Sequence, residues 1–95
     1  MKKYEAMFII KPDLSEDEKK ALFSQIDDAI VKNNGKVLQA NVWSERKKLI
    51  FPIKKQHEGI YYLVNFNAPP EAAAKIRQAY KLNESILRVL ITKIE

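Results

Sequence analysis

The sequence predicts an α+β fold in which two helices cover one face of a four-stranded antiparallel sheet. Four segments alternate apolar and polar residues with the period of a strand, and two others space their apolar residues as amphipathic helices do. In chain order the segments read strand, helix, strand, strand, helix, strand. The chain has 95 residues, which suffice for one domain spanning residues 1–95.

The first strand and the first helix are predicted from residues 3–34. The strand is expected at residues 3–11, where every second residue, from Tyr4 to Ile10, is apolar. Ser15 and Glu18 have the spacing of a capping box, so a helix should begin there. It should run to about Asn33, and Asn34-Gly35 can adopt positive φ at its end. The apolar stripe of this helix comprises Leu22, Phe23, Ile26, Ala29 and Ile30.

A long, bent second strand is expected at residues 36–53. Pro52 lacks a backbone N–H, which places this strand at an edge of the sheet, and the charged residues 44–48 are compatible with a bulge. Residues 54–59 are expected to form a polar hairpin loop. The third strand should then span residues 60–67.

The second helix and the last strand complete the fold. Pro69-Pro70 can start the helix, because the backbone N–H groups of a first turn have no partner within the helix and proline lacks only this group. Leu82-Asn83 is expected to end the helix. The final strand alternates from Leu87 to Thr92. The order of elements specifies a ferredoxin-like split βαβ sandwich with strands one and three in the centre. The buried stripe of the second helix is expected to comprise Ala73, Ile76, Ala79 and Tyr80.

The residue types exclude several kinds of chemistry. The chain has no cysteine, so it can form no disulfide, thiolate metal site or cysteine nucleophile, and it fits a reducing cytoplasm. No apolar run approaches the length of a membrane-spanning helix. His57 is the only histidine and has no spaced second ligand. We therefore expect no metal, no cofactor, no small-molecule ligand and no membrane association, and the protein is expected not to be an enzyme.

Positive charge is concentrated in the second part of the chain. Residues 1–35 carry six basic and seven acidic groups, whereas residues 36–95 carry eleven and five. The richest cluster comprises Arg46, Lys47, Lys48, Lys54 and Lys55. These cations could engage RNA phosphates, or they could protect an exposed strand edge from aggregation. Charge alone supports the two interpretations equally.

The face of the sheet opposite the helices is expected to be partly apolar. It should present Lys3, Glu5, Met7, Ile9, Tyr61, Leu63, Asn65, Arg88, Leu90 and Thr92. A contiguous apolar patch on a monomer often marks a partner interface. The alternative is that these are scattered exposed apolar residues, which are normal on protein surfaces.

Several motifs in order resemble the bacterial small-subunit ribosomal protein six family along essentially the whole chain. They are the opening Lys2-Lys3-Tyr4-Glu5, Asn34-Gly35, Trp43 followed by Arg46-Lys47-Lys48, the segment 49–55 (LIFPIKK), the segment 58–62 (EGIYY) and the segment 82–88 (LNESILR). Ser44-Glu45 replaces a single glycine common in that family, and the long tail of many members is not expected after Glu95.

The resemblance implies a structural role in the small ribosomal subunit, in the cytoplasm and without catalysis. It implies pairing with small-subunit ribosomal protein eighteen and binding to the central domain of small-subunit ribosomal RNA. The apolar part of the open sheet face would bind the partner protein through Met7, Ile9, Tyr61, Leu63 and Leu90. By similarity, RNA contacts would fall on Lys2, Lys3, Arg46, Lys47, Lys48, Lys54, Lys55, Arg88 and Lys93.

Two alternatives stay open from the sequence. The first is a ferredoxin-like small-molecule sensor domain, which ligand-dependent thermal stabilisation would reveal. The second is an RNA-binding protein that stacks bases on its third strand, in which Tyr61→Ala would abolish binding.

Overall fold

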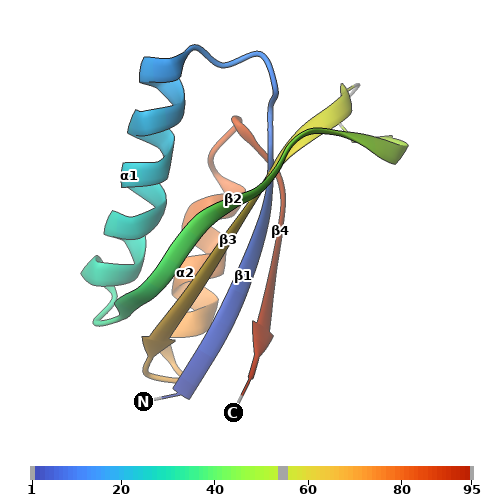
Figure 1. The fold of residues 1–95 in the computed structure, drawn as a ribbon. Coiled ribbons are helices and arrows are strands. Elements are labelled where there is room, and N and C mark those ends of the chain that lie inside the picture. The colour runs from blue at the N-terminus through green and yellow to red at the C-terminus, as the bar shows by residue number, and fades with distance from the viewer. Residues whose placement is uncertain (1, 54–55, 95) are drawn as a thin grey trace.

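Two helices pack against one face of a four-stranded antiparallel sheet (Figure 1). The computed structural model describes residues 2–53 and 56–94. The helices are α1 (Glu16–Lys32) and α2 (Ala72–Lys81), and the strands are β1 (Lys2–Ile10), β2 (Lys36–Ile53), β3 (Gln56–Ala68) and β4 (Ile86–Lys93). The predicted α+β class, the element order and the ferredoxin-like arrangement are confirmed.

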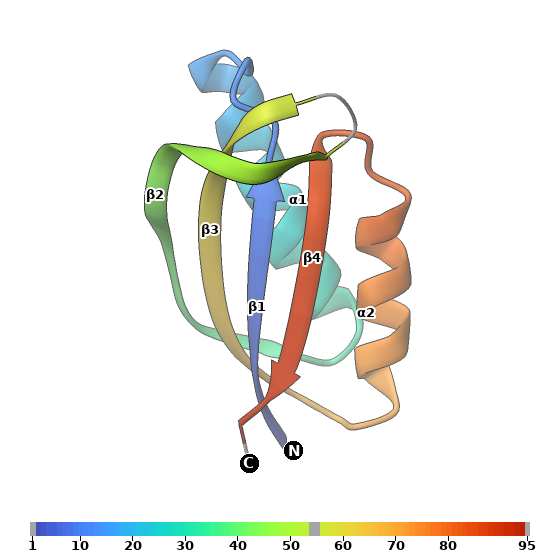
Figure 2. The ribbon, with the colours of Figure 1, turned by 90° about the vertical axis from the view of Figure 1, so that its right-hand side faces the viewer.

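The strands lie in the order β2-β3-β1-β4, so β1 and β3 are central as predicted. Pro52 belongs to β2, which lies at an edge and can therefore accommodate a residue without a backbone N–H. Tyr4 of β1 pairs with Lys93 of β4, and the Ile94 N–H donates a 2.8 Å hydrogen bond to the Lys3 carbonyl. The first and last strands therefore meet, and Figure 2 shows both chain ends at the same end of the sheet.

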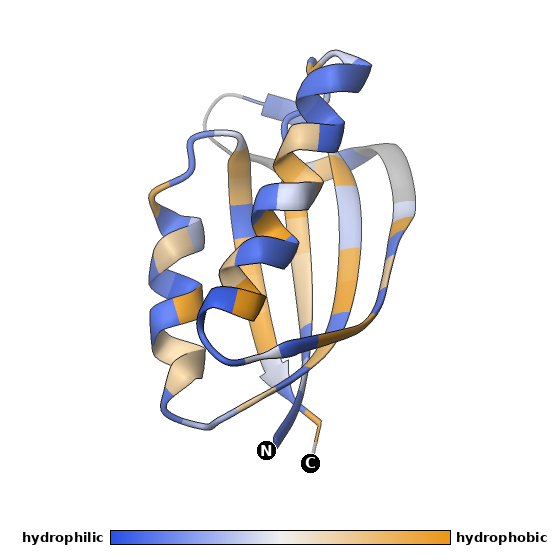
Figure 3. Cartoon of the chain, turned by 90° about the vertical axis from the view of Figure 1, so that its left-hand side faces the viewer, coloured by the Kyte–Doolittle hydropathy of each residue, from blue (hydrophilic) through white to orange (hydrophobic). Residues whose placement is uncertain are grey.

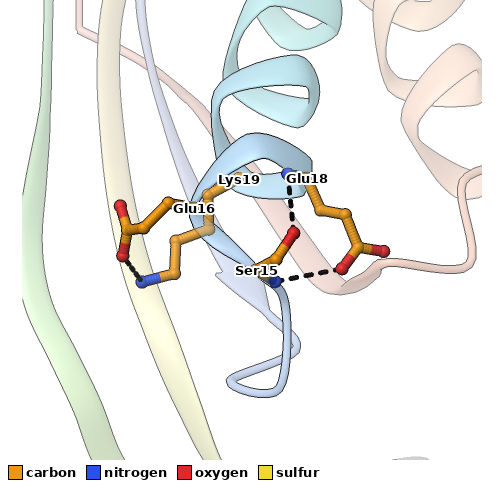
Figure 4. Close-up of polar contacts among 4 residues, drawn as sticks. All are labelled: Ser15, Glu16, Glu18 and Lys19. Carbon is orange, nitrogen blue, oxygen red and sulfur yellow. Dashed lines mark hydrogen bonds and ion pairs between the residues drawn. The ribbon is translucent and has the colours of Figure 1, made fainter.

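Local side-chain bonds set the start of α1. The Ser15 hydroxyl accepts a 3.2 Å hydrogen bond from the Glu18 N–H, and the Glu18 carboxylate accepts a 3.0 Å bond from the Ser15 N–H (Figure 4). This is the predicted capping box, which satisfies two otherwise unpaired N–H groups. These bonds lower the pKa of Glu18, because they favour its charged form.

A tight turn between α1 and β2 uses two residues for different reasons. Asn34 takes the left-handed conformation, with φ of 66°. Gly35 keeps negative φ, but a Cβ there would lie 2.6 Å from Ile30 Cγ2 and 3.0 Å from the Asn67 carbonyl oxygen. Its N–H donates to the Ile30 carbonyl at 2.8 Å. Close approach of the backbone, rather than positive φ, therefore explains this glycine.

The core lies between the sheet and the two helices. Both helices alternate hydrophilic and hydrophobic segments, as an amphipathic element packed on a sheet must (Figure 3). The largest fully buried side chains are Phe8, Phe66, Ile10, Ile26, Ile30, Ile60, Ile76 and Val64. One prediction about α2 was wrong: Ala79 is exposed and Ala72 is buried. The buried residues of the helix are Ala72, Ile76 and Tyr80. They are four residues apart and therefore share the face that packs on the sheet.

The β2–β3 hairpin also differs from the prediction. Residues 56–59 extend β3 instead of forming a polar loop, because Lys48 pairs with Glu58 and Ile53 with Gln56. Polar composition does not prevent strand pairing when the partner strand supplies the backbone bonds. The expected bulge is confirmed by register shifts on either side of Ser44. Beyond the bulge, the hairpin extends away from the helices (Figure 1).

Candidate functional site

The face of the sheet that the helices leave uncovered is organised in rows across all four strands. Its middle row runs Asn41, Leu63, Met7, Leu90, as the strand registers show. The next row toward the hairpin runs Ser44, Tyr61, Ile9, Arg88, and the row on the other side runs Gln39, Asn65, Glu5, Thr92. Cross-strand neighbours lie about 5 Å apart at Cβ. The predicted partner residues Met7, Ile9, Tyr61, Leu63 and Leu90 are therefore contiguous.

These five residues differ in how far they are exposed. Met7, Ile9, Tyr61 and Leu63 lie on central strands and are half-buried by their neighbours, whereas Leu90 on the edge strand is 61% exposed. The structure adds a sixth large apolar side chain to this face. The Trp43 ring packs edge-on against Tyr61 with centroids 5.6 Å apart, and Trp43 is 52% exposed. The apolar face is defined here as these six residues.

Simple alternation along β2 places Trp43 on this face. Asn41 pairs with Leu63 of the open face, whereas Val42 pairs with Tyr62 on the helix side. Trp43 therefore shares the parity of Asn41, and the register shift begins only after Val42. This alternation was the signal in the sequence, but the prediction for the open face covered only the other three strands.

Gly59 lets the hairpin cross the end of the apolar face. A Cβ at Gly59 would lie 2.5 Å from Ile9 Cγ2 and 3.7 Å from Leu49 Cδ2. Leu49 is buried, although it belongs to the part of β2 that extends past the bulge. The missing side chain at residue 59 thus makes room for Ile9, and the hairpin passes in front of the upper ends of β1 and β4 (Figure 2).

Predicted RNA-contacting residues gather at the end of the sheet that carries the two chain ends. Lys2 and Lys93 are exposed and Lys3 is half-buried. Lys3 pairs with Asn67, and Lys36 of β2 pairs with the same asparagine from the other side. Lys36 is exposed, and it was not predicted as an RNA contact because only the sheet register reveals its neighbours.

Two of the remaining predicted cations have described side chains, and both lie toward the hairpin end. Arg88 is exposed beside Ile9, and Lys48 is exposed on the β2 part of the hairpin. Lys54 and Lys55 lie outside the described residues. For Arg46 and Lys47 the structure describes their place in β2 but not their side chains. Cations therefore lie at both ends of the apolar face.

A shallow hollow lies beside the apolar face, near the chain ends. It has a volume of about 320 Å³ and is lined by Lys3, Glu5, Leu38, Gln39, Asn65 and Ile94. The side-chain oxygen of Asn65 is buried there and has no hydrogen-bond partner among the described residues. A buried amide oxygen without a partner is unusual in a folded protein.

On the helix side, the ionisable groups in the core interface serve packing. Burial raises the pKa of Asp27 on α1, the neighbouring Asp28 adds to the shift, and hydrogen bonding with Tyr62 opposes it. Burial also raises the pKa of Tyr62 to about 12. The Phe23 and Tyr62 rings stack with centroids 4.2 Å apart over the same interface. These groups face the packed core rather than the open face.

Neither metal ligation nor a membrane span is indicated by the described part of the chain. Residues 2–53 and 56–94 contain no group of three or more histidine, cysteine, aspartate or glutamate side chains placed to hold a metal ion. Within the same ranges, no helix is both long and apolar enough to cross a membrane.

Comparisons with known proteins agree on one family. The family model described as ribosomal protein S6 matches residues 3–93. The small ribosomal subunit protein bS6 of Caldanaerobacter subterraneus is 36% identical over the whole chain and 99% of its own length. That of Dictyoglomus turgidum is 39% identical, over 97% of its length.

Among solved structures, the fold is similar to the crystal structure of 30S ribosomal protein S6 from Thermotoga maritima. The TM-score is 0.89 at 26% identity, over 97% of this chain and 86% of that one. The family model and the full-length relatives confirm the resemblance that the motifs indicated. The chain therefore belongs to the ribosomal protein S6 family of the small ribosomal subunit.

Proposed function

We propose that this protein is a structural component of the small ribosomal subunit that binds the central domain of its ribosomal RNA together with small-subunit ribosomal protein eighteen. The observation that carries the proposal is the uncovered sheet face, where a contiguous apolar surface is flanked by cations at both ends. Such a surface suits a protein partner in the middle and phosphates at the rim.

The apolar face has the composition of a protein interface. Trp43, Tyr61 and Arg88 are of the types that carry most binding energy in interfaces, and Met7 can adapt its shape to a partner. Burial of Leu90 and Trp43, which are 61% and 52% exposed, would remove a large apolar area from water.

RNA binding would depend on the heterodimer. Cations of this chain at the two ends of the sheet would bind RNA weakly and in a salt-sensitive way on their own, whereas the partner would place its own cations beside them. The two proteins would then bind RNA as one bivalent unit, with a higher effective concentration for the second contact. Catalysis plays no part in this role.

The partner interface is tested by a matched pair of substitutions. Leu90→Glu puts a charge on the apolar face, and Val31→Glu puts the same charge on α1, where Val31 is 60% exposed. Equal exposure makes the two variants comparable in folding. We expect Leu90→Glu to weaken binding to ribosomal protein eighteen by at least tenfold in a pull-down or calorimetric titration, and Val31→Glu to leave it unchanged. Equal binding by both variants would refute the assignment of this face.

RNA binding is tested by titrating a central-domain RNA fragment with this protein, with and without ribosomal protein eighteen, at several salt concentrations. We expect tight binding only with the partner, and an affinity that falls steadily as salt rises. Failure to bind in both conditions would refute the proposed function and would favour the metabolite-sensor alternative. Abolition of binding by Tyr61→Ala alone would favour base stacking on β3 instead.

A further inference from the structure

The two helices differ strongly in charge although they lie in one layer. α1 carries Glu16, Asp17, Glu18, Asp27 and Asp28 against three lysines. α2 carries Lys75, Arg77 and Lys81 and no acidic residue, and the neighbouring strand β4 adds Arg88 and Lys93. The electrostatic field of this layer is therefore polarised, and a polyanion would be repelled from α1 and attracted to the α2–β4 side.

Two hollows on the α2–β4 side are lined by cations and, among the residues that the structure describes, by no carboxylate. One, of about 220 Å³, is lined by Tyr80, Lys81, Ile86, Leu87, Arg88 and Val89. The other, of about 280 Å³, is lined by Ala74, Arg77, Gln78 and Lys81. Lys81 belongs to both hollows, so Arg77, Lys81 and Arg88 border one continuous surface. Glu84 is close in sequence but lines neither hollow.

Arg77 is anchored at the free edge of β4. Its guanidinium donates a 3.5 Å hydrogen bond to the Ile91 carbonyl, which ties α2 to the edge strand. A guanidinium has five N–H donors, so several remain for another acceptor. Arg77 is exposed, and Lys81 follows it on α2 at a rise of about 6 Å along the helix. Two cations at this spacing can contact different phosphates of one strand.

From these observations we infer that Arg77 and Lys81 on α2, together with Arg88 on the neighbouring edge strand, form a phosphate-binding surface for RNA on the α2–β4 side. The inference rests on the proposed function and extends RNA binding to α2. Neither the clustering of charge nor the family resemblance predicted RNA contacts on this helix. The ligand is the RNA backbone rather than an acidic protein segment. Protein partners are usually anchored by large exposed apolar side chains, and most of those that the structure describes lie away from α2. Near the α2–β4 surface, the exposed apolar side chain is Leu82 at the end of α2.

The test compares two double variants with the same change in net charge. Arg77→Gln/Lys81→Gln removes two cations from α2, and Lys20→Gln/Lys32→Gln removes two exposed cations from α1. Each protein, bound to ribosomal protein eighteen, is titrated with a central-domain RNA fragment across a range of salt concentrations. Thermal melting confirms that both variants are folded, since Arg77→Gln also removes the bond to Ile91.

We expect the α2 variant to bind RNA about tenfold more weakly and to lower the slope of log affinity against log salt by about 1.5 to 2. The α1 variant should keep the wild-type slope. Wild-type binding with equal slopes in both variants would overturn the inference while leaving the proposed function intact. Failure of the wild type itself would overturn the proposed function. Loss of binding to ribosomal protein eighteen without RNA, in the α2 variant alone, would identify the surface as a protein interface and also overturn the inference.

Discussion

The hydroxyl of Tyr80 on α2 donates a 2.7 Å hydrogen bond to the backbone carbonyl of Ile26 on α1. This buried bond joins the two helices directly. The same ring packs edge-on against Phe8 of the sheet, with centroids 4.8 Å apart. One side chain thus connects all three parts of the core, and burial raises the pKa of its phenol because the charged form is poorly solvated there.

Tyr80→Phe should destabilise the protein by about 1 to 2 kcal/mol, because it removes the hydroxyl but keeps the ring contact with Phe8. Urea unfolding followed by circular dichroism measures the loss. Tyr4→Phe is the control, since Tyr4 is also a core residue whose ring stacks against an aromatic neighbour, but its hydroxyl makes no hydrogen bond with any described residue. A loss no larger for Tyr80→Phe than for Tyr4→Phe would show that the bond contributes little.

Ser15→Ala should cost about 1 kcal/mol, because it removes the side-chain acceptor from the capping box at the start of α1. Ser24→Ala is the control on the exposed middle of the same helix, where alanine has the higher helix propensity. The midpoint of thermal unfolding should fall for Ser15→Ala and stay or rise for Ser24→Ala. An equal fall of the unfolding midpoint in both variants would show that the Ser15 cap does not stabilise the helix.

Asp27→Asn should stabilise the protein at neutral pH. The folded state raises the pKa of Asp27 above its ordinary value of 3.8, so it favours the protonated form more than the unfolded state does. The contribution of Asp27 to stability is therefore greatest below that ordinary value, and it falls as pH rises through the raised pKa. An asparagine is uncharged throughout, so its advantage appears above the raised pKa.

Thermal melting between pH 3 and pH 8 tests this sign. The gain from Asp27→Asn should be present at pH 7 and disappear at about pH 3, where the wild-type carboxyl is also protonated. Asp28→Asn should give a smaller gain of the same sign, because Asp28 is only the second cause of the shift. A destabilised Asp27→Asn protein at pH 7 would mean that the charge of Asp27 is favourable where it lies.

Trp43 should report partner binding, because it is the only tryptophan of the chain and is 52% exposed on the apolar face. Its fluorescence should shift to shorter wavelength when ribosomal protein eighteen covers the indole and removes water from it. A partner in which any tryptophan is replaced by phenylalanine makes the signal unambiguous. Saturated binding without a shift would place the interface away from the Trp43 end of the face.

Most of the fold follows from the sequence because its periodic signals are local. The capping box at Ser15, the edge position of β2 with Pro52 and the central positions of β1 and β3 all agree with the prediction. The errors arose where tertiary pairing overrides composition. Residues 56–59 are polar but extend β3, and Ala79 has an apolar side chain on an exposed part of α2.

The candidate site was predictable only in part. Strict alternation in β1, β3 and β4 placed Met7, Ile9, Leu63 and Leu90 on one face, and the register confirms that they are neighbours. Trp43 shares the parity of Asn41 and was missed because the prediction for this face covered only the other three strands. Lys36, Arg77 and Lys81 were missed because they are close in space to Lys3 and Arg88 but not in sequence, and a single sequence does not give that proximity.

The pairing of Tyr4 with Lys93 has a consequence for how the protein is made. β1 is synthesised first, yet one of its two neighbours in the sheet is the last strand to leave the ribosome. Such contacts between distant parts of a chain are costly in loop entropy and slow to form. A growing chain can pair β1 with β3 early, but β1 keeps an open edge until β4 arrives. During synthesis this edge is a site for mispairing, and completion of β4 closes it.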